Sequence, residues 1–414
     1  MAKDFLEIPL EIPNIRIEKL ETDPSGDFII TVTDTTDRTL CHKCGRVITK
    51  FYGYGREIRL RHLPILGHKS YILIGPKRYE CSFCGGGTTT THKSLWYSAK
   101  SPETTAYENH ILCELVSSTV TDVSFREKIG YKAIKGIIDR RIGYESDRNN
   151  IESSDTIGID EISIKKGHKD FVTVITSHVA DKTGIAGLIR GREKNSVKNF
   201  LSDIPERLRN TIRVVCCDMY DGYINAAKEV LGAGIIIAAD RFHAAKLYRK
   251  GLETLRKQEM KRLKKDLPDE DYKKLKGAMW ALRKDESELM QEDREVLRSI
   301  FRYSPALKAA YGHCAELTYI FNRNIPKSKA KREIGIRAEM VWLLGLECFE
   351  DFLSTLKLRI DEITNYFTDR KTSGFVEGMN NKIKVIKRRC YGIFNIRHLF
   401  QRIFIDIEGY SLFA

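Results

Sequence analysis

The sequence TIRVVCCDMYDG, residues 211–222, predicts a short buried strand that ends at an acidic residue. Neighbouring side chains of a strand point to opposite faces, so Cys216 and Cys217 would make poor joint ligands for one metal. We expect both cysteines to behave as small apolar residues. Asp218 stands where the strand leaves the core, whereas Asp221 falls in the turn before the next helix and is expected to cap it. The stretch therefore offers one main candidate for chemistry, Asp218.

A mixed α/β sheet is predicted around this strand, within residues 155–240. Three strand-like runs come first, followed by a helix, the Asp218 strand, a second helix and a fifth strand that ends near Asp240. The other runs are TIGIDEISIKKG (156–167), DFVTVITSHVAD (170–181), TGIAGLIRG (183–191), KNSVKNFLSDIPERL (194–208), YINAAKEVLG (223–232) and GIIIAADRFH (234–243). This order fits the ribonuclease-H-like fold, in which carboxylates of the first and fourth strands meet at the sheet surface.

Asp160 is the candidate carboxylate of the first strand. It is followed by Glu161, and because neighbours on a strand face opposite sides, only one of the two is expected at the site. A carboxylate in a buried strand is costly unless it is paired or binds a metal. Asp160 and Asp218 could together hold one Mg²⁺, but a two-metal site needs at least a third carboxylate.

A predicted amphipathic helix at residues 373–389 carries a candidate for that third carboxylate, Glu377, in its first turn. Its apolar stripe consists of Val376, Met379, Ile383, Ile386 and Cys390. Five of the eight residues 382–389 are basic, which suits a helix that holds a phosphodiester backbone. The candidate DNA-binding residues are Asn381, Lys384, Lys387, Arg388 and Arg389. Taken alone, the pattern also fits a solvated helix with a basic face.

Four cysteines in two Cys-x-x-Cys pairs form a candidate metal site near the N-terminus, CHKCG with Cys41 and Cys44 and CSFCG with Cys81 and Cys84. Two residues between thiolates let one tight turn present both sulfurs, and the glycine after each pair permits the positive φ that such a turn often needs. Four thiolates suit a structural Zn²⁺. The 36 intervening residues hold two strand-like runs, which would make a zinc ribbon with a long hairpin. A redox dithiol is the alternative.

Charge favours a polyanionic partner. The chain has 70 Lys and Arg residues against 56 Asp and Glu residues, a net charge of +14 at pH 7, so nucleic acid is the leading candidate. No stretch approaches the roughly 20 apolar residues of a membrane span, and the charges scattered through residues 1–20 do not fit a signal peptide. We therefore expect a cytoplasmic protein without membrane contact.

Residues 108–143 predict short helices that could form a helix-turn-helix. Apolar positions at helical spacing are interrupted near residues 117–124 by serine and threonine. The basic side chains that would then face DNA are Lys132, Lys135, Arg140 and Arg141. The alternative is a helical linker with a solvated basic face, since the turn lacks a sharp glycine signal.

Residues 245–365 are predicted to be almost wholly helical and are heavily charged. Trp280 and Trp342 fall in this region, and we expect both in its core. The alternative is that one of them stacks on a displaced base near the cut site of a nucleic acid.

Four motifs in this order resemble the DDE transposases of bacterial insertion sequences, and the zinc-ribbon-bearing ISL3 family above all. The motifs are IGIDE, CDMYDGY, DRFHAAKL and EGMNNKIKVIKRRCYGI, behind the double Cys-x-x-Cys ribbon. The resemblance covers nearly the whole chain and implies a multidomain α/β protein whose ribonuclease-H-like catalytic core is interrupted by an α-helical insertion. The implied parts are a zinc ribbon (1–95), a helix-turn-helix-like DNA-binding segment (96–150), the first part of the core (151–244), the insertion (245–365) and the second part of the core (366–414).

Carried onto this chain, the resemblance implies a catalytic triad of Asp160, Asp218 and Glu377. The first two are 58 residues apart, and Glu377 lies 159 residues after Asp218 because the insertion intervenes. The triad would hold Mg²⁺ or Mn²⁺, with Asp160 shared between two ions, while Zn²⁺ would be structural. Side chains that support the ions without binding them would be Asp240, Arg241 and His243.

The implied partners are DNA, as element terminal inverted repeats and as target, and further copies of the chain in a homodimer or higher oligomer on the nucleoid. Two alternatives remain open: a catalytically silent zinc-ribbon DNA-binding regulator, and another ribonuclease-H-like nuclease. The complete acidic trio argues against the first, and the N-terminal ribbon and helices argue against the second.

Overall fold

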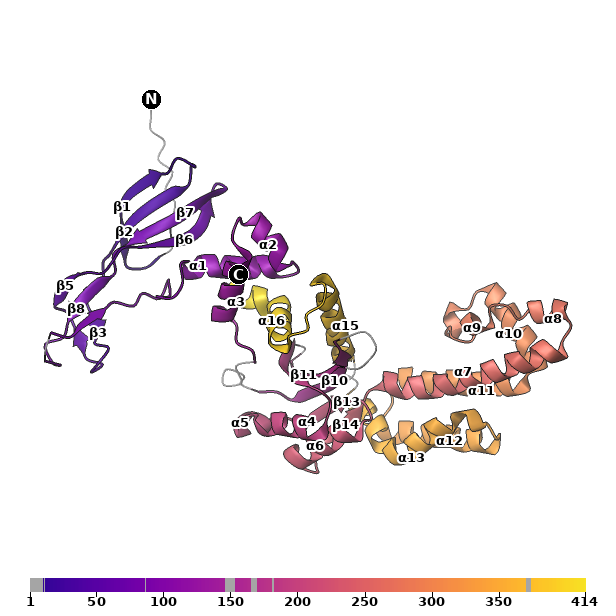
Figure 1. The fold of residues 1–414 in the computed structure, drawn as a ribbon. Coiled ribbons are helices and arrows are strands. Elements are labelled where there is room, and N and C mark those ends of the chain that lie inside the picture. The colour runs from indigo at the N-terminus through magenta and orange to yellow at the C-terminus, as the bar shows by residue number, and fades with distance from the viewer. Residues whose placement is uncertain are drawn as a thin grey trace. The chain divides into compact units, whose positions relative to one another are not determined.

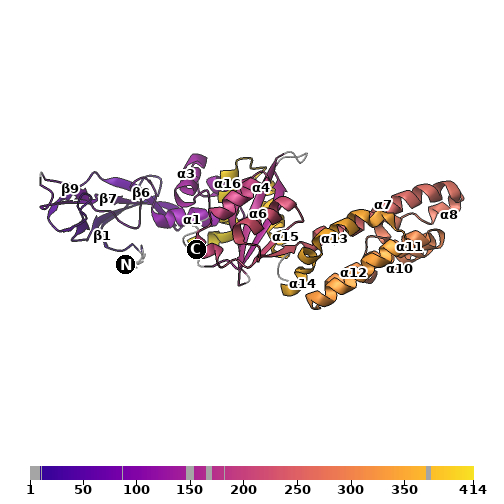
Figure 2. The same cartoon turned by 90° about the horizontal axis from the view of Figure 1, so that it is seen from below.

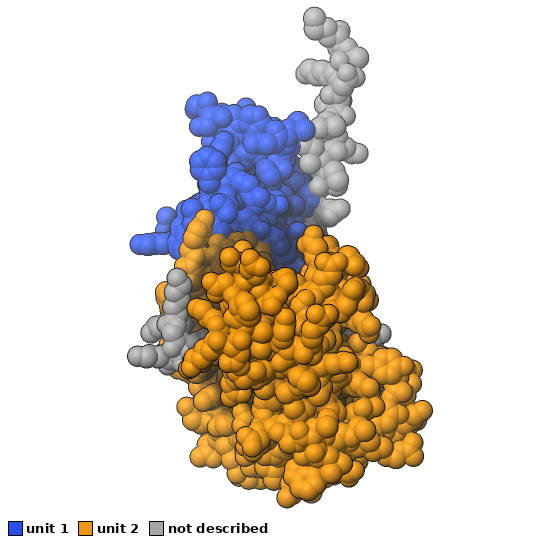
Figure 3. Space-filling model, turned by 90° about the vertical axis from the view of Figure 1, so that its right-hand side faces the viewer, with its two compact units in different colours: residues 1–142, 404–414 blue, residues 143–403 orange. Residues whose placement is uncertain are grey.

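The computed structural model describes residues 10, 12–85, 87–145, 153–164, 170–180, 182–369 and 374–414. Contacts divide the chain into two compact units, which Figure 3 colours separately. One unit comprises residues 1–142 with 404–414, and the other comprises residues 143–403. The sequence grouped residues 366–414 with the central sheet, whereas the structure assigns the last eleven residues to the N-terminal unit.

A four-stranded sheet with its own core opens the N-terminal unit. Its order is β1 (Ile15–Thr22), β2 (Phe28–Asp34), β7 (His68–Ile74) and β6 (Ile58–Ile65), and only β2 and β7 run parallel. The core of this sheet consists of Ile30, Val32, Leu60, Ile72 and Ile74. The hairpin expected between the cysteine pairs is therefore present as β6–β7, but it pairs with β2 instead of extending the cysteine-bearing strands.

Two smaller sheets carry the four cysteines. One pairs β3 (Thr39–Leu40) with β4 (Val47–Ile48), and the other has the order β5 (Phe51–Tyr54), β8 (Lys77–Glu80) and β9 (Thr89–Thr91). Each cysteine pair lies in the loop that follows a strand, after β3 and after β8. Short strands with tight loops thus bring together two segments that are 36 residues apart in the chain.

Three short helices complete the unit: α1 (Thr105–Leu115), α2 (Val120–Arg126) and α3 (Tyr131–Arg141). Thr104 and Thr119 cap the first two through their side chains. The last part of α16 (Ile396–Phe413) packs among these helices, where Ile405 is fully buried and Asp406 accepts a hydrogen bond from the Ser117 backbone at 2.7 Å. The end of the chain thus contributes to the core of its N-terminal unit.

The second unit is built on a five-stranded mixed sheet. The order is β12 (Lys182–Arg190), β11 (Phe171–Val179), β10 (Thr156–Ser163), β13 (Val214–Cys217) and β14 (Ile236–Ala239). Among the first three strands, β11 runs antiparallel to both of its neighbours, β12 and β10, whereas β13 and β14 run parallel to β10. All five strands were predicted from the sequence. The helix before β13 and the helix between β13 and β14 were predicted as well.

Helices cover both faces of this sheet (Figure 1). On one face, α4 (Lys194–Ser202) and α6 (Asp221–Leu231) pack on the side that includes Cys217. On the other face, α15 (Gly374–Arg389) packs on Cys216 through Val376. The expectation that the two cysteines face opposite sides as buried apolar residues is therefore confirmed. Between α4 and β13 lies one helical turn, α5 (Glu206–Arg209).

A helical insertion separates β14 from α15. Figures 1 and 2 show α7, α11, α12 and α13 side by side, and these helices share one apolar core. The helices of the insertion are α7 (Arg241–Asp266), α8 (Asp269–Lys273), α9 (Ala278–Ala281), α10 (Gln291–Tyr303), α11 (Pro305–Asn322), α12 (Lys327–Leu343), α13 (Glu350–Thr364) and α14 (Tyr366–Asp369), with 3₁₀ turns at Glu286–Glu288 and Glu347–Phe349.

The expectation that both tryptophans lie in this core is wrong, because Trp280 is 62% exposed and Trp342 is 75% exposed. In the single turn of α9, the neighbours Ala278 and Ala281 face the core, which leaves Trp280 outside. In α12, the buried Val341 precedes Trp342 and points inward in its place.

Gly158 on β10 decides how closely α15 approaches the sheet. A Cβ atom there would lie 2.6 Å from Val376 Cγ2 and 2.3 Å from Thr176 Oγ1. Gly158→Ala should therefore push α15 from the sheet and lower the free energy of unfolding by about 1–3 kcal/mol. The change can be measured by urea denaturation and by faster amide hydrogen exchange in α15.

The matched control for this substitution is Gly335→Ala, because Gly335 lies within α12 and a Cβ there meets nothing within 4 Å. The free energy of unfolding of that variant should rise by about 0.5–1 kcal/mol, because alanine loses less conformational freedom than glycine when a helix forms. Equal effects of the two substitutions would show that α15 is not held by close packing at Gly158.

Candidate functional site

The four N-terminal cysteines form a compact cluster. Their sulfur atoms all lie within 4.8 Å of one another, with 3.8 Å between Cys41 and Cys84 and 3.8 Å between Cys44 and Cys81. Sulfur ligands about 2.3 Å from a tetrahedral zinc would be about 3.8 Å apart. The cluster therefore fits a structural zinc ion. Both trailing glycines have the expected positive φ, 72° at Gly45 and 62° at Gly85.

The cluster also shows the electrostatics of a thiolate site. Backbone N–H groups of Cys44 and Lys43 lower the pKa of Cys41 to about 6, and the Lys43 amide lies 3.4 Å from the Cys41 sulfur. The neighbouring thiols, Cys44 first, raise the pKa of Cys84 to about 12. Four crowded sulfurs therefore cannot all ionise on their own, whereas a dication would permit it.

Three aspartates line up at one edge of the five-stranded sheet because of its register. Ile159 on β10 pairs with Cys217 on β13, and Cys217 pairs with Ala239 on β14. Each of these residues is followed by an aspartate, respectively Asp160, Asp218 and Asp240. The carboxyl ends of parallel strands are where ligands bind in open α/β sheets. Together with His243, the three aspartates line one small hollow.

Each aspartate of the hollow accepts a hydrogen bond from the backbone. Asp160 accepts from the Glu161 amide at 2.7 Å, and Asp218 accepts from the Tyr220 amide at 3.0 Å. Asp240 caps α7 by accepting from the Phe242 amide at 2.9 Å, and it also accepts from His243 Nδ1 at 3.3 Å.

Burial raises the pKa of Asp160 and the pKa of Asp218 above the ordinary range. The nearby charges of Asp218 and Asp240 raise the pKa of Asp160 further. The hydrogen bond to Asp240 raises the pKa of His243, so its imidazolium is favoured beside the carboxylates. Within the described part of the chain, neither Asp160 nor Asp218 forms an ion pair with lysine or arginine. Both carboxylates therefore remain available to a cation.

Glu377 does not join these aspartates. Its side chain is exposed in the first turn of α15, although the preceding Val376 lines the same hollow. Among the described residues, no three carboxylates come within 4.8 Å of one another; only the four cysteines do so. Arg241 points into the insertion, where it donates to the Tyr366 hydroxyl at 3.1 Å.

Asn380, which the sequence analysis missed, contacts the site directly. Its side-chain amide donates to Asp160 Oδ2, while its Oδ1 is buried and has no hydrogen-bond partner among the residues that the structure describes. The residue is 4% exposed. Its position, four after Val376 and three before Ile383, marks it as a polar residue on the packed face of the helix. That spacing was the signal that could have identified it.

The candidate DNA-binding residues of α15 differ in their surroundings. Asn381, Lys384 and Arg388 are exposed, as expected for a nucleic-acid contact. Lys387 instead donates to the Ser163 carbonyl of β10, and burial lowers the pKa of its ammonium group. Arg389 is half-buried.

Two further acidic residues, Glu161 and Asp221, lie close in sequence to the aspartates of the hollow. Glu161 faces away from Asp160 and lies 3.5 Å from Arg192, as the strand alternation predicted. Asp221 is not the helix cap: α6 begins at Asp221, Tyr220 is the N-cap residue, and the Asp221 carboxylate pairs with Arg359. The helix thus begins one residue earlier than expected, and within the turn Asp218 accepts from the Tyr220 amide.

Arg140 and Arg141, which were expected to face DNA in a helix-turn-helix, are both held in ion pairs, and their contact with DNA stays a prediction. Arg140 lies 2.9 Å from Glu103 and 2.7 Å from Glu108, and Arg141 lies 3.2 Å from Glu108. Both glutamates are about 95% buried, so each arginine is held as the partner of a buried charge. Lys132 is exposed, whereas Lys135 is half-buried with its pKa lowered by burial.

Comparisons with known proteins agree with the motifs. The family model for ISL3-type DDE transposases, described as "Transposase", matches residues 157–403. The transposase for insertion sequence element IS1001 of Bordetella parapertussis is 23% identical over 396 residues, covering 95% of each chain. The transposase for IS1557 of Mycobacterium tuberculosis is 22% identical over 422 aligned residues, covering 95% of this chain and 92% of the relative. Of the helices described, none is both long and apolar enough to cross a membrane.

Removal of one thiolate tests the zinc cluster. Cys81→Ser should reduce bound zinc from about one ion per chain to almost none, because three thiolates leave the tetrahedral site incomplete. Elemental analysis of the purified protein measures the ratio. Cys113→Ser, outside the cluster, is the control and should retain zinc; an unchanged ratio in Cys81→Ser would exclude this site.

The raised pKa of Asp160 predicts a stability cost. Because its carboxyl is harder to ionise in the fold, its contribution to stability is present below its ordinary pKa of 3.8 and is lost as pH rises through the raised value. Asp160→Asn should thus melt higher than the native chain at pH 7 in EDTA, by about 2–4 °C per kcal/mol gained. Scanning calorimetry measures the difference, which should shrink as pH falls.

The control for this measurement is Asp351→Asn, whose carboxylate is 68% exposed and should change little. If Asp160→Asn melted at or below the native midpoint in EDTA at pH 7, burial of the ionised Asp160 carboxylate would not lower the stability of the fold, and the prediction would be wrong.

Proposed function

Because the chain belongs to the ISL3 family of DDE transposases, we propose that it binds the ends of an insertion sequence and cuts and joins DNA through Asp160, Asp218 and Glu377. The observation that carries this proposal is the strand register that sets Asp160 beside Asp218. Its relatives are named transposases of insertion elements over 95% of this chain. The three carboxylates would carry out the cutting and joining of DNA in this chain.

The proposed core is ribonuclease-H-like. Three antiparallel strands followed by two parallel strands, in the order β12-β11-β10-β13-β14, support this assignment. So does the position of the two aspartates on the first and fourth strands of the sheet in chain order. The insertion between β14 and α15 then separates the third acidic residue from the first two along the chain.

The donor set suits Mg²⁺ or Mn²⁺. Asp160 and Asp218 offer hard oxygen ligands, and burial keeps the pKa of each raised although the nearby charge of His243 lowers both. Glu377 would supply the third carboxylate from the first turn of α15, next to Val376 in the wall of the hollow. When bound, divalent cations would activate the attacking oxygen and stabilise the leaving oxygen of a phosphodiester.

The residues around the aspartates have separate tasks in this proposal. Asn380 fixes the orientation of the Asp160 carboxylate from the packed face of α15. His243, held by Asp240, places a positive charge beside the hollow that partly offsets the negative charge of the aspartates. The exposed Lys384 and Arg388 on α15 would contact the DNA backbone.

The N-terminal unit would recognise the ends of the element. Its cysteine cluster would hold a structural zinc, and its helices α1–α3 would contribute DNA contacts. Because a transposase must bring two ends together, we expect a dimer or higher oligomer on DNA in the nucleoid.

Substitution of each proposed ligand tests the triad. Asp160→Asn, Asp218→Asn and Glu377→Gln should each reduce Mg²⁺-dependent cleavage of terminal-repeat DNA by more than about 100-fold, since a lost ligand costs more than a lost supporting group. End binding in gel-shift assays should remain.

Glu161→Gln is the matched control, because Glu161 is next to Asp160 but on the other face of the sheet. It should keep cleavage within a few-fold of the native rate. Full activity of Glu377→Gln would remove that residue from the triad, and absence of cleavage by the native chain with intact end binding would favour a silent DNA-binding regulator.

A further inference from the structure

A groove of 1010 Å³ runs along the helical insertion between α7 and α11. The two helices are antiparallel there: Arg241 donates to Asn322 at 3.4 Å, while Tyr248, two turns further along α7, bonds Thr318 at 3.0 Å. The groove begins where α7 begins, directly after Asp240 and beside His243. It therefore opens next to the hollow that holds the aspartates.

The groove is basic. Seven lysines and arginines line it against three acidic residues. Lys246 forms no ion pair with a described residue, and Arg249 has only an exposed contact of 3.6 Å with Asp285. Exposed ion pairs of this kind contribute little to stability, so a phosphate can replace such a partner. Phe242, Lys246 and Arg249 recur at helical spacing along one exposed face of α7.

Exposed aromatic side chains lie among these cations. Phe242 on α7 is 44% exposed, and Tyr319 on the facing α11 is 60% exposed. Both line the groove near the end where Arg241 meets Asn322. Large aromatic rings left exposed between basic side chains form a surface on which nucleic-acid bases stack while their phosphates are neutralised.

We propose that this groove binds a segment of single-stranded DNA next to the phosphodiester that is cut, with bases on Phe242 and Tyr319 and phosphates on Lys246 and Arg249. The inference rests on the proposed function, because a strand held in this groove lies next to the aspartates that are proposed to cut it. It names a separate surface that would hold the unpaired end of a strand while the carboxylates act on it.

An unpaired strand fits the groove better than a duplex. In a duplex the bases are stacked on one another, so their faces cannot reach Phe242 or Tyr319. An acidic protein segment would match the charge of the cations, but its carboxylates would not stack on the exposed rings of Phe242 and Tyr319.

Binding of a short oligonucleotide in EDTA tests the proposal without catalysis. The full chain is mixed with a fluorescent ten-nucleotide single strand containing 5-bromouracil, in excess unlabelled duplex that occupies duplex-binding surfaces. Irradiation should crosslink the strand to peptides of α7 and α11. The double variant Phe242→Ala/Tyr319→Ala should lose these crosslinks and bind the strand about ten-fold more weakly in anisotropy titrations.

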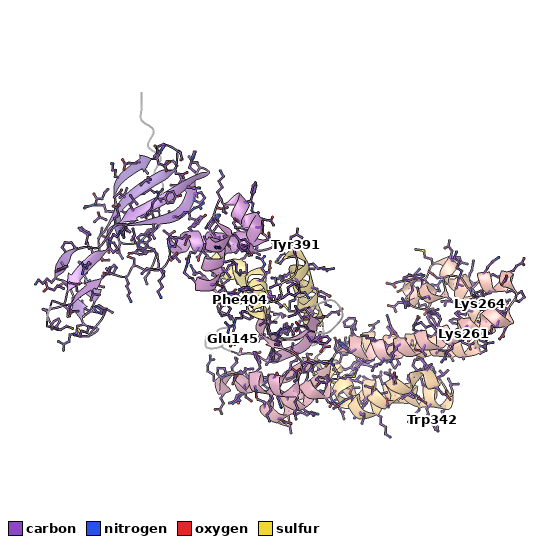
Figure 4. All side chains as sticks on the ribbon, viewed as in Figure 1. Glu145, Lys261, Lys264, Trp342, Tyr391 and Phe404 are labelled. Atoms are coloured by element: carbon purple, nitrogen blue, oxygen red, sulfur yellow. The ribbon has the colours of Figure 1, made fainter. Side chains whose placement is uncertain are left out.

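Charge reversal tests the phosphate contacts. Lys246→Glu/Arg249→Glu should weaken binding and reduce the salt slope of the affinity by about 1.4, at about 0.7 for each phosphate contact. Matched controls are available on the same insertion. Figure 4 labels Lys261 and Lys264 on α7 and Trp342 on α12, and none of these exposed residues lines the groove. Lys261→Glu/Lys264→Glu and Trp342→Ala should bind as the native chain does.

Three results would overturn the proposal: no crosslink to α7 or α11 in the native chain, equal weakening of duplex binding by the aromatic variant, or a change in self-association with no change in strand affinity. The first excludes the groove, the second indicates a duplex surface, and the third indicates a protein interface. None depends on cleavage, so the groove can fail while Asp160-dependent cleavage stands, and the reverse.

Discussion

The register of three parallel strands is the constraint on which the site depends. Because Ile159, Cys217 and Ala239 lie side by side, the aspartates that follow them must share one edge of the sheet. Burial makes the Asp160 and Asp218 carboxyls harder to ionise, and nearby like charges add to this effect. Asp240 is compensated by the start of α7 and by His243. Asp160 and Asp218 accept hydrogen bonds from backbone amides and, at Asp160, from one side-chain amide, and the charge of His243 offsets their burial only in part. A divalent cation would complete this arrangement.

Close packing of α15 is the second requirement. Gly158 leaves room for Val376 and Phe375 on the sheet, and this contact sets the height at which Asn380 reaches Asp160. The same helix carries Glu377 in its first turn and Lys384 and Arg388 further along its exposed side. One packed helix therefore couples the orientation of a carboxylate to the position of the basic surface proposed to hold DNA.

Local patterns in the sequence were sufficient for the elements of this fold but not for their partners. The strands around Asp160 and Asp218 follow from apolar runs, and the opposite directions of Cys216 and Cys217 follow from the two-residue period of a strand. The cysteine cluster follows from spacing, since a Cys-x-x-Cys turn needs no distant information. The β6–β7 hairpin was predictable as a hairpin, but its pairing with β2 is a long-range choice that periodicity does not encode.

The features that the sequence did not reveal have the same origin. The ion pairs of Arg140 and Arg141 were not predicted because the buried glutamates that hold them are about 30 residues away in sequence. Trp280 was expected in the core of the insertion, but the residues of its one-turn helix that face this core are Ala278 and Ala281. Asn380 was visible in the helical pattern as a polar residue among buried ones, yet only the tertiary structure shows that its partner is Asp160, 220 residues earlier.

The most direct test of the account is a crystal structure of the chain with an element-end DNA and Mn²⁺, in which anomalous scattering locates the metal. The account predicts manganese bound to carboxylate oxygens of both Asp160 and Asp218, with the Glu377 side chain turned toward it. Manganese bound elsewhere, or coordination of Asp160 and Asp218 with Glu377 still exposed to solvent, would contradict the proposed triad.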